Sequence, residues 1–181
     1  RDPEAKAFTL MALAGLGRMR GRNRSSLAAY TRALSIARRL RLRYAQAYAN
    51  CGIGNAWRIL GDTRQARRHL VTADRLYRSI GDRVSRPYTL WALALLDRDP
   101  APLCQAEKLW RATRDHRGLV YAGLGRAALA GERPTEALRQ AKRLGIRLEE
   151  AHALALCGLA RARRAYRSLG VKPPVSPVAI P

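Results

Sequence analysis

Apolar residues recur at intervals of three and four between Thr63 and Ile80, with arginines on the other faces. This spacing is typical of an amphipathic helix that buries one side against a partner. Asp62 stands where a helix N-cap is expected, and Gly81 stands where the helix should end. The alanine-rich stretch 44–60 precedes this helix and ends at Gly61. Together the two stretches predict an antiparallel helical hairpin with a tight turn.

The same pattern occurs 40 residues earlier in the chain. Gly21 and Arg43 stand 40 residues before Gly61 and Arg83. The apolar positions coincide in the pairs Leu13 and Ile53, Tyr30 and Leu70, and Ala33 and Ala73. A fixed internal period indicates a stack of helical repeats.

Weaker copies of the pattern follow towards the C-terminus. They predict helices over 88–96, 103–113, 119–130 and 135–144, and a last helix over 149–169. We therefore expect one repeat domain over 1–170, with repeats at about 5–43, 44–83, 84–117 and 118–147 and the last helix as a terminal element. Residues 171–181 contain four prolines and predict an extended Pro-rich tail. Whether its own groove or another chain would hold this tail stays open.

Small residues occupy the positions where the helices of a hairpin would cross. In the second copy these and the associated bulky positions are Gly54-Asn55-Ala56-Trp57, Leu60-Gly61-Asp62, Ala66, Leu70 and Ala73. This set resembles the tetratricopeptide repeat (TPR) family, and the first copy matches about half of it. The resemblance covers about residues 5–147 and implies an all-α fold. The implied architecture is a right-handed TPR-like α-solenoid of about four helical hairpins plus a terminal helix.

The resemblance also implies a concave face, on which the family generally holds an extended peptide or a partner's helix. It places on this face the candidate partner-binding residues Phe8, Met11, Arg18, Tyr48, Asn55 and Arg58. Asn55 is at the position that often contacts the ligand backbone. Met11 replaces the lysine that chaperone-binding members use, so a C-terminal carboxylate ligand of that type is not expected. The mixture of apolar and cationic side chains suits an acidic or amphipathic segment, and packing on a neighbouring repeat is the alternative role.

Positive charge is concentrated in the first third of the chain. The 181 residues include 35 Lys and Arg against 13 Asp and Glu, which gives a formal net charge of +22. From Ala5 to Gly61 there are eleven cations and no acid. Two basic clusters stand out, Arg20, Arg22 and Arg24, and then Arg38, Arg39, Arg41 and Arg43. Arginine-rich codon usage, capping of helix C-termini, and contact with phosphates or acidic patches are the three interpretations.

The sequence contains few residue patterns that are typical of catalytic, cofactor-binding or metal-binding sites. Gly123 and Gly125 imitate a dinucleotide-binding fingerprint, but the chain that follows is too short for that fold, and helix crossing explains both glycines. Glu149 and His152 form half of a di-iron ligand set without its other half. We therefore expect no enzyme activity, no cofactor and no metal site.

The remaining sequence features concern the cellular compartment, membrane insertion and oligomeric state of the protein. Cys51, Cys104 and Cys157 are far apart, so we expect small buried residues in a cytoplasmic or other reducing compartment. No stretch approaches 18 consecutive apolar residues, which argues against a membrane span. The oligomeric state is left open.

These observations lead to one expected function and two alternatives. The first is a non-catalytic protein–protein interaction scaffold or adaptor that binds an acidic or amphipathic segment in the concave groove. The second is a basic structural subunit of a ribonucleoprotein or nucleic-acid-handling assembly, which would contact phosphates non-specifically through the arginine clusters. The third is the sensor or repeat region of a larger bacterial regulator.

Overall fold

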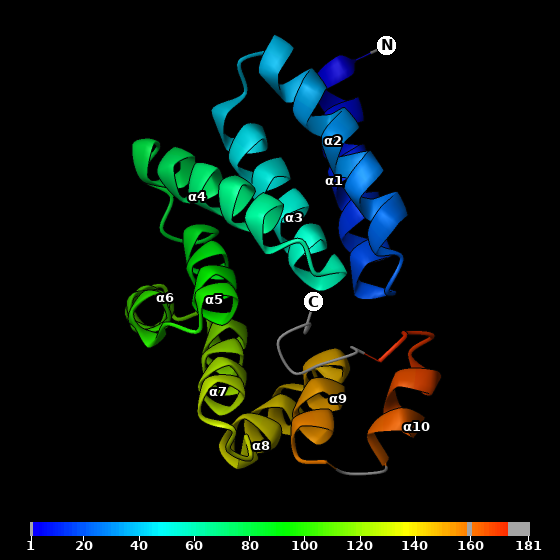
Figure 1. The fold of residues 1–181 in the computed structure, drawn as a ribbon, viewed down its shortest axis with the longest axis vertical. Helices are drawn as coiled ribbons and strands as arrows, with labels where there is room; N and C mark the ends of the chain where they lie inside the picture. The colour runs from blue at the N-terminus through cyan, green and yellow to red at the C-terminus, as the bar shows by residue number, and fades with distance from the viewer. Residues whose placement is uncertain (1, 159–160, 174–181) are drawn as a thin grey trace. The chain divides into compact units, whose positions relative to one another are not determined.

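The described residues of the computed structural model, 2–158 and 161–173, form ten α-helices and no strand (Figure 1). Consecutive helices pack as antiparallel pairs, which confirms the all-α prediction and its repeat-like arrangement. The chain divides into two compact units. Unit 1 is described over residues 2–89, and unit 2 over 90–158 and 161–173.

The helices of unit 1 follow the 40-residue period of the sequence. They are α1 (Pro3–Met19), α2 (Asn23–Arg39), α3 (Arg43–Leu60), α4 (Thr63–Ser79) and the start of α5 (Arg86–Asp97). Within unit 1, α2 packs between α1 and α3, and α3 packs on α4. Short turns join these helices, as Figure 1 shows for the hairpins α1–α2 and α3–α4.

The turns of the second hairpin have the predicted local chemistry. Asp62 is the N-cap of α4, and its Oδ1 accepts a hydrogen bond from the backbone N–H of Gln65 at 2.9 Å. Gly61 and Gly81 have φ values of +91° and +69°, in the region that favours glycine. The first hairpin departs from this pattern, because Arg22 stands in place of the capping aspartate and makes no side-chain cap. Arg41 stands in place of Gly81 and has a φ of +56°.

Glycines let the helices of unit 1 approach closely. A Cβ at position 52 would lie 2.3 Å from the ring carbon Cζ of Tyr30. A Cβ at position 54 would lie 2.6 Å from Leu70 Cγ. Both facing side chains are buried, so neither can move away without opening the core. The prediction that small residues mark helix crossings is confirmed at these positions.

Unit 2 contains the rest of α5 and five further helices. These are α6 (Pro100–Ala112), α7 (His116–Ala130), α8 (Thr135–Leu144), α9 (Arg147–Leu156) and α10 (Arg161–Ser168). Gly125 lies inside α7, where a Cβ would be 2.9 Å from the Trp91 indole nitrogen. Gly123 in the same helix faces Ala137, so helix crossing accounts for both glycines of the false fingerprint.

Two sequence predictions need correction. The single terminal helix over 149–169 is wrong, because α9 ends at Leu156 and α10 begins at Arg161. Gly158 in the intervening segment has a φ of +67°, which a continuing right-handed helix cannot accommodate. The prediction of three buried cysteines is also wrong, since Cys104 is exposed and Cys51 and Cys157 are half-buried.

Residues 174–181 of the predicted tail lie outside the described residues. Among the helices that are described, none combines the length and the apolar character needed to cross a membrane.

Candidate functional site

Four tyrosines from three helices form a row in unit 1. The ring centroids of Tyr30 and Tyr48 are 6.4 Å apart, those of Tyr48 and Tyr44 are 6.2 Å apart, and those of Tyr44 and Tyr77 are 6.2 Å apart. These separations lie within the range of aromatic contact. Tyr30 and Tyr77 are buried at the ends of the row, whereas Tyr44 and Tyr48 are 41% and 37% exposed. The row therefore exposes two aromatic side chains at the surface and anchors them on two buried ones.

Arg18 of α1 stands at one end of this row. Its guanidinium lies beside the Tyr30 hydroxyl, where Gly15 leaves room for that hydroxyl to approach α1. The Nε of Arg18 is buried and has no hydrogen-bond partner among the described residues. A buried donor on a charged group carries a desolvation cost that a carboxylate or phosphate oxygen would relieve.

The hydroxyls of Tyr30 and Tyr48 stay protonated at ordinary pH. Burial raises the pKa of Tyr30, and the nearby Arg18 acts in the opposite direction. Burial also raises the pKa of Tyr48, with the neighbouring Tyr30 as a further cause. A protonated hydroxyl can donate a hydrogen bond, so the exposed Tyr48 offers a donor to an acidic ligand.

Asn55 and Arg58 follow Tyr48 along α3. The Nε and Nη2 of Arg58 donate to Asn55 Oδ1 at 3.2 and 3.0 Å. The Nδ2 of Asn55 donates to the carbonyl of Cys51 at 3.1 Å. Both side chains are buried, so the amide that the resemblance assigns to a ligand is engaged within its own helix. Burial raises the pKa of the Cys51 thiol, which keeps it protonated and unreactive.

The remaining two candidate residues differ in their exposure. Met11 is 2% exposed and belongs to the core of unit 1 with Tyr30 and Ile53, so its side chain does not face a ligand. Phe8 is 40% exposed on α1. Sequence reasoning missed Tyr44, although its place four residues before Tyr48 puts both on one face of a helix.

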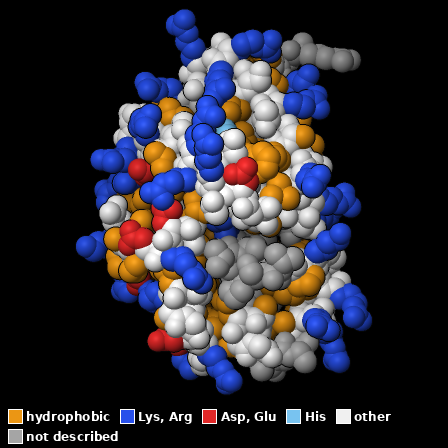
Figure 2. Space-filling view, in the orientation of Figure 1, with side chains coloured by type: hydrophobic (Ala, Val, Ile, Leu, Met, Phe, Trp, Pro, Cys, Tyr) orange, Lys and Arg blue, Asp and Glu red, His pale blue; other side chains and the backbone are white. Residues whose placement is uncertain are grey.

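The basic clusters lie on the surface at the two ends of α2. All seven side chains are exposed, and none forms an ion pair among the described residues. The length of α2, 17 residues, separates the clusters by about 25 Å. Figure 2 shows Lys and Arg projecting from much of the visible surface, with few Asp and Glu between them.

The acids of unit 1 are mostly occupied in local structure. Asp2, Asp62 and Asp82 accept hydrogen bonds from backbone N–H groups at helix starts or turns. Asp74 Oδ1 pairs with Arg86 Nε at 2.7 Å. These carboxylates therefore do not neutralise the two basic clusters.

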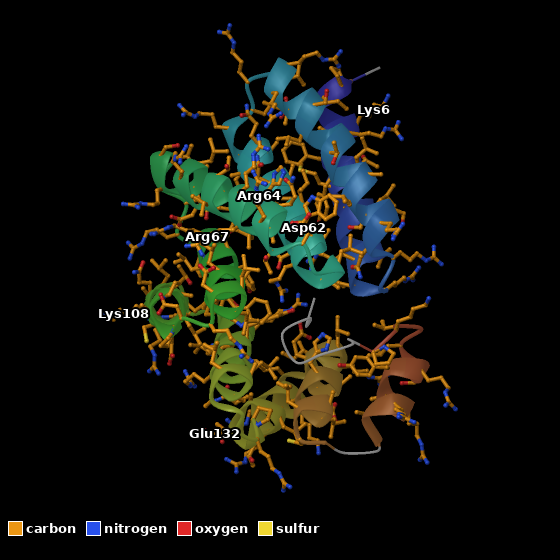
Figure 3. All side chains as sticks on the ribbon, in the orientation of Figure 1. Lys6, Asp62, Arg64, Arg67, Lys108 and Glu132 are labelled. Atoms are coloured by element: carbon orange, nitrogen blue, oxygen red, sulfur yellow. The ribbon has the colours of Figure 1, made fainter. Side chains whose placement is uncertain are left out.

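A depression of about 620 Å³ adjoins the second basic cluster. Lys6, Arg32 and Arg39 supply the cations of its wall, with Asp2 and Ser35 among the polar residues. Lys6 is labelled beside the start of α1 in Figure 3. A cation of the second cluster, Arg39, and a cation of the first turn of α1, Lys6, thus line the same depression.

A partly buried polar contact joins α3 to α4. Asn50 Nδ2 donates to the carbonyl of Gln46 at 2.7 Å, which fixes the amide orientation. Asn50 Oδ1 therefore accepts from the Nδ1–H of His69, at 2.9 Å. Burial lowers the pKa of His69, and the neighbouring Arg68 and Arg38 lower it further.

The Glu149-x-x-His152 pair of unit 2 has structural partners. Glu149 Oε1 accepts from Arg117 Nε at 2.7 Å and from its Nη2 at 2.5 Å. His152 Nδ1 lies 2.7 Å from the Tyr166 hydroxyl, which ties α9 to α10. Among the residues described, no group of three or more His, Cys, Asp and Glu is placed to hold a metal ion.

Comparisons with models of protein families, with curated proteins and with solved structures find no match. No family is identified for the chain by this route. The function is therefore inferred from the side chains of unit 1 and their charge.

Proposed function

We propose that this protein is a non-catalytic interaction module built from TPR-like helical hairpins. In this proposal, an acidic or amphipathic segment of a partner protein binds to unit 1 along Tyr44, Tyr48 and Arg18. The hairpin period of 40 residues and the close helix approach at Gly54 support the relation to TPR proteins.

The observation that carries the proposal is the unpartnered Nε of Arg18 beside the tyrosine row. An acidic side chain there would accept from the guanidinium, and the exposed rings of Tyr44 and Tyr48 would pack against the apolar residues of the same segment. Asn55 and Arg58 would stabilise the part of α3 that follows Tyr48, through the hydrogen bonds that they make within this helix.

The test is a selection of random peptides on the immobilised full chain, followed by titration of the selected peptides in solution. We expect the selected peptides to be enriched in Asp and Glu next to apolar residues. Arg18→Gln and Tyr48→Ala should each weaken binding by about tenfold or more, since a hydrogen bond to a charged group contributes about 1.5–3 kcal/mol.

The matched control for these variants is Arg75→Gln. Arg75 is exposed on α4, and its loss lowers the net charge by the same amount as Arg18→Gln. Binding to this control should equal binding to the natural chain. Equal weakening of binding by Arg18→Gln and Arg75→Gln would show that the peptides respond to net charge alone, and would refute the proposed site.

A second candidate function is phosphate binding by the basic clusters in a nucleic-acid-handling assembly. The observation in its favour is the placement of Arg22 at the N-cap of α2, where the second hairpin has an aspartate. A cation at a helix N-terminus is locally unfavourable, and its presence there suggests a role outside the fold.

This candidate is tested by the salt dependence of binding to a labelled single-stranded oligonucleotide. Replacing Arg20, Arg22, Arg39 and Arg41 with Gln should reduce the slope of log affinity against log salt by about 0.7 for each phosphate that is no longer neutralised. The control replaces Arg64, Arg68, Arg75 and Arg78, which are exposed on α4. A slope that changes equally in both variants would refute a site at the clusters.

A further inference from the structure

The outer face of α1 is an apolar stripe without a covering element among the described residues. Its members recur at helical spacing and are all exposed, namely Ala5, Thr9, Ala12, Leu13 and Leu16. Leu13 is 59% exposed and Leu16 is 43% exposed. The opposite face of α1, with Ala7, Met11 and Ala14, is already buried in the core.

The internal repeat shows what the equivalent face does elsewhere. Adding 40 to each position gives a stripe on α3, whose members are all buried, namely Ala45, Ala49, Gly52, Ile53 and Ala56. Ala45, Ala49 and Ile53 belong to one hydrophobic cluster with residues of α2, namely Tyr30, Ala33, Leu34 and Ala37. Gly52 faces the Tyr30 ring of the same cluster. The stripe on α3 is therefore the surface on which the second helix of the preceding hairpin packs.

The stripe on α1 is also free of charge. Between Lys6 and Arg18 the sequence has no charged residue, although 27% of the chain is charged. An exposed and uncharged helix face on so basic a protein is typical of a covered interface. It is also distinct from the tyrosine row and from the basic clusters.

We propose that the outer face of α1 binds the second helix of a further hairpin of the same 40-residue type. The occupant packs on Ala5, Thr9, Ala12, Leu13 and Leu16 as α2 packs on α3. This proposal goes beyond the proposed function, because it assigns a second binding surface with a different kind of partner.

The residue at position 12 specifies one feature of the occupant. On α3, Gly52 admits the Tyr30 ring, which would lie 2.3 Å from a Cβ at that position. The stripe on α1 has Ala12 there, so a tyrosine at the matching place of the occupant would overlap its methyl group. The occupant therefore carries a smaller residue, such as leucine, which stands at the equivalent position 70 of α4.

A second copy of the chain fits this face less well. The matching face of α2 is covered by α3, and the apolar residues of α4, such as Leu70 and Tyr77, are buried. Within unit 1, the uncharged helix face that a second copy leaves exposed is that of its own α1. Such a pairing would bring together two strongly basic chains and would not reproduce the α2–α3 contact.

The experiment extends the full chain with a copy of residues 3–40 placed before Arg1. The connection then consists of the copied Leu40 followed by Arg1 and Asp2, which equals in length the natural connection over 40–42. In the copy, Tyr30 is replaced by leucine. We expect the added hairpin to unfold together with unit 1 in urea, at a higher midpoint than in the natural chain. Separate unfolding of the copy, with an unchanged midpoint for the rest, would overturn the proposal.

Substitution of the stripe makes the test specific. Leu13→Arg with Leu16→Arg should abolish the gain from the extension, and it should change the natural chain little because both residues are exposed. Val84→Arg, at a residue that is 61% exposed in unit 1, is the control and should preserve the gain. A gain that survives the stripe substitutions would place the copy elsewhere and overturn the proposal.

The size of the residue at position 12 gives a further test, whose result non-specific hydrophobic association would not reproduce. On the natural α1, an added hairpin that keeps tyrosine at position 30 of the copy should raise the urea midpoint less than one with leucine there. In a chain that carries Ala12→Gly, the tyrosine copy should give the larger rise. An order that is the same on both backgrounds would contradict the proposed register. Sedimentation of the natural chain provides the last outcome, since a dimer that Leu13→Arg dissociates would make a second copy the occupant and overturn the proposal.

Discussion

Replacing Arg22 with aspartate should stabilise the protein, because it installs a missing N-cap on α2. The backbone at Arg22 (φ −86°, ψ 56°) is close to that at Asp62 (φ −85°, ψ 89°), the equivalent position of the second hairpin. There Asp62 Oδ1 accepts from the N–H of the residue three positions later at 2.9 Å. In Arg22→Asp the new carboxylate would accept from the N–H of Ser25.

The magnitude has two parts. A side-chain N-cap contributes about 1 kcal/mol to the free energy of unfolding, within a range of about 0.5–2 kcal/mol. Exchanging a cation for an anion at a helix N-terminus adds about 0.3–1 kcal/mol through the helix dipole. We therefore expect Arg22→Asp to raise the free energy of unfolding by about 1–2 kcal/mol, the sum of these contributions.

The assay is equilibrium urea unfolding followed by far-UV circular dichroism, with amide hydrogen exchange of Ser25 as a local readout. Arg24→Asp is the control, since Arg24 is exposed in the first turn of α2 and the substitution changes the charge equally. Arg24→Asp should raise the free energy of unfolding only by the contribution of the helix dipole, and the exchange rate of the Ser25 amide should stay unchanged. If Arg22→Asp is no more stable than Arg24→Asp, the capping argument is wrong.

The same variant also separates stability from function. If the basic clusters bind phosphate, Arg22→Asp should be more stable and should bind an oligonucleotide more weakly than the natural chain. Unchanged binding would leave Arg22 without a functional reason for its unfavourable position.

Four further outcomes can be measured by urea unfolding. Gly52→Ala should lower the free energy of unfolding by about 1–3 kcal/mol, because its methyl group would overlap a buried ring. Gly17→Ala is the control, because its Cβ would be 3.8 Å from its nearest neighbour, and it should raise the free energy of unfolding by up to about 1 kcal/mol. If both substitutions changed the free energy of unfolding equally, the proposed clash at position 52 would be wrong. His69 has a lowered pKa in the folded state, so the unfolded state binds more protons below about pH 6.5 and stability should fall on acidification. His69→Gln should make this loss smaller, and an unchanged pH profile would exclude His69 as its source. Tyr166→Phe should cost about 1–3 kcal/mol in unit 2 by removing the hydroxyl that contacts buried His152, and a neutral effect would show that this contact is dispensable.

Local signals in the sequence were sufficient for most of the helices. The period of three and four over 63–80, the N-cap Asp62 and the stops Gly61 and Gly81 each act within one or two turns of a helix. Short-range rules of this kind do not depend on the rest of the chain, so α3 and α4 begin and end within one residue of their predicted bounds. The break in the terminal helix was signalled by Gly158, but the apolar spacing on either side concealed it.

The candidate site depended on contacts between helices, which the sequence alone could not supply. Met11 and Leu13 are both apolar and two residues apart, yet Met11 is buried in the core and Leu13 is exposed on the α1 stripe. Tyr44 belongs to the candidate site because the tyrosine row continues onto other helices, through Tyr30 of α2 and Tyr77 of α4, and the sequence does not show these contacts. The sequence by itself thus determined an all-α, strongly basic chain with a 40-residue hairpin period, because propensity, capping and charge are local properties. Only the tertiary structure decided which apolar and cationic side chains face outward, because exposure is set by the elements that pack on each helix.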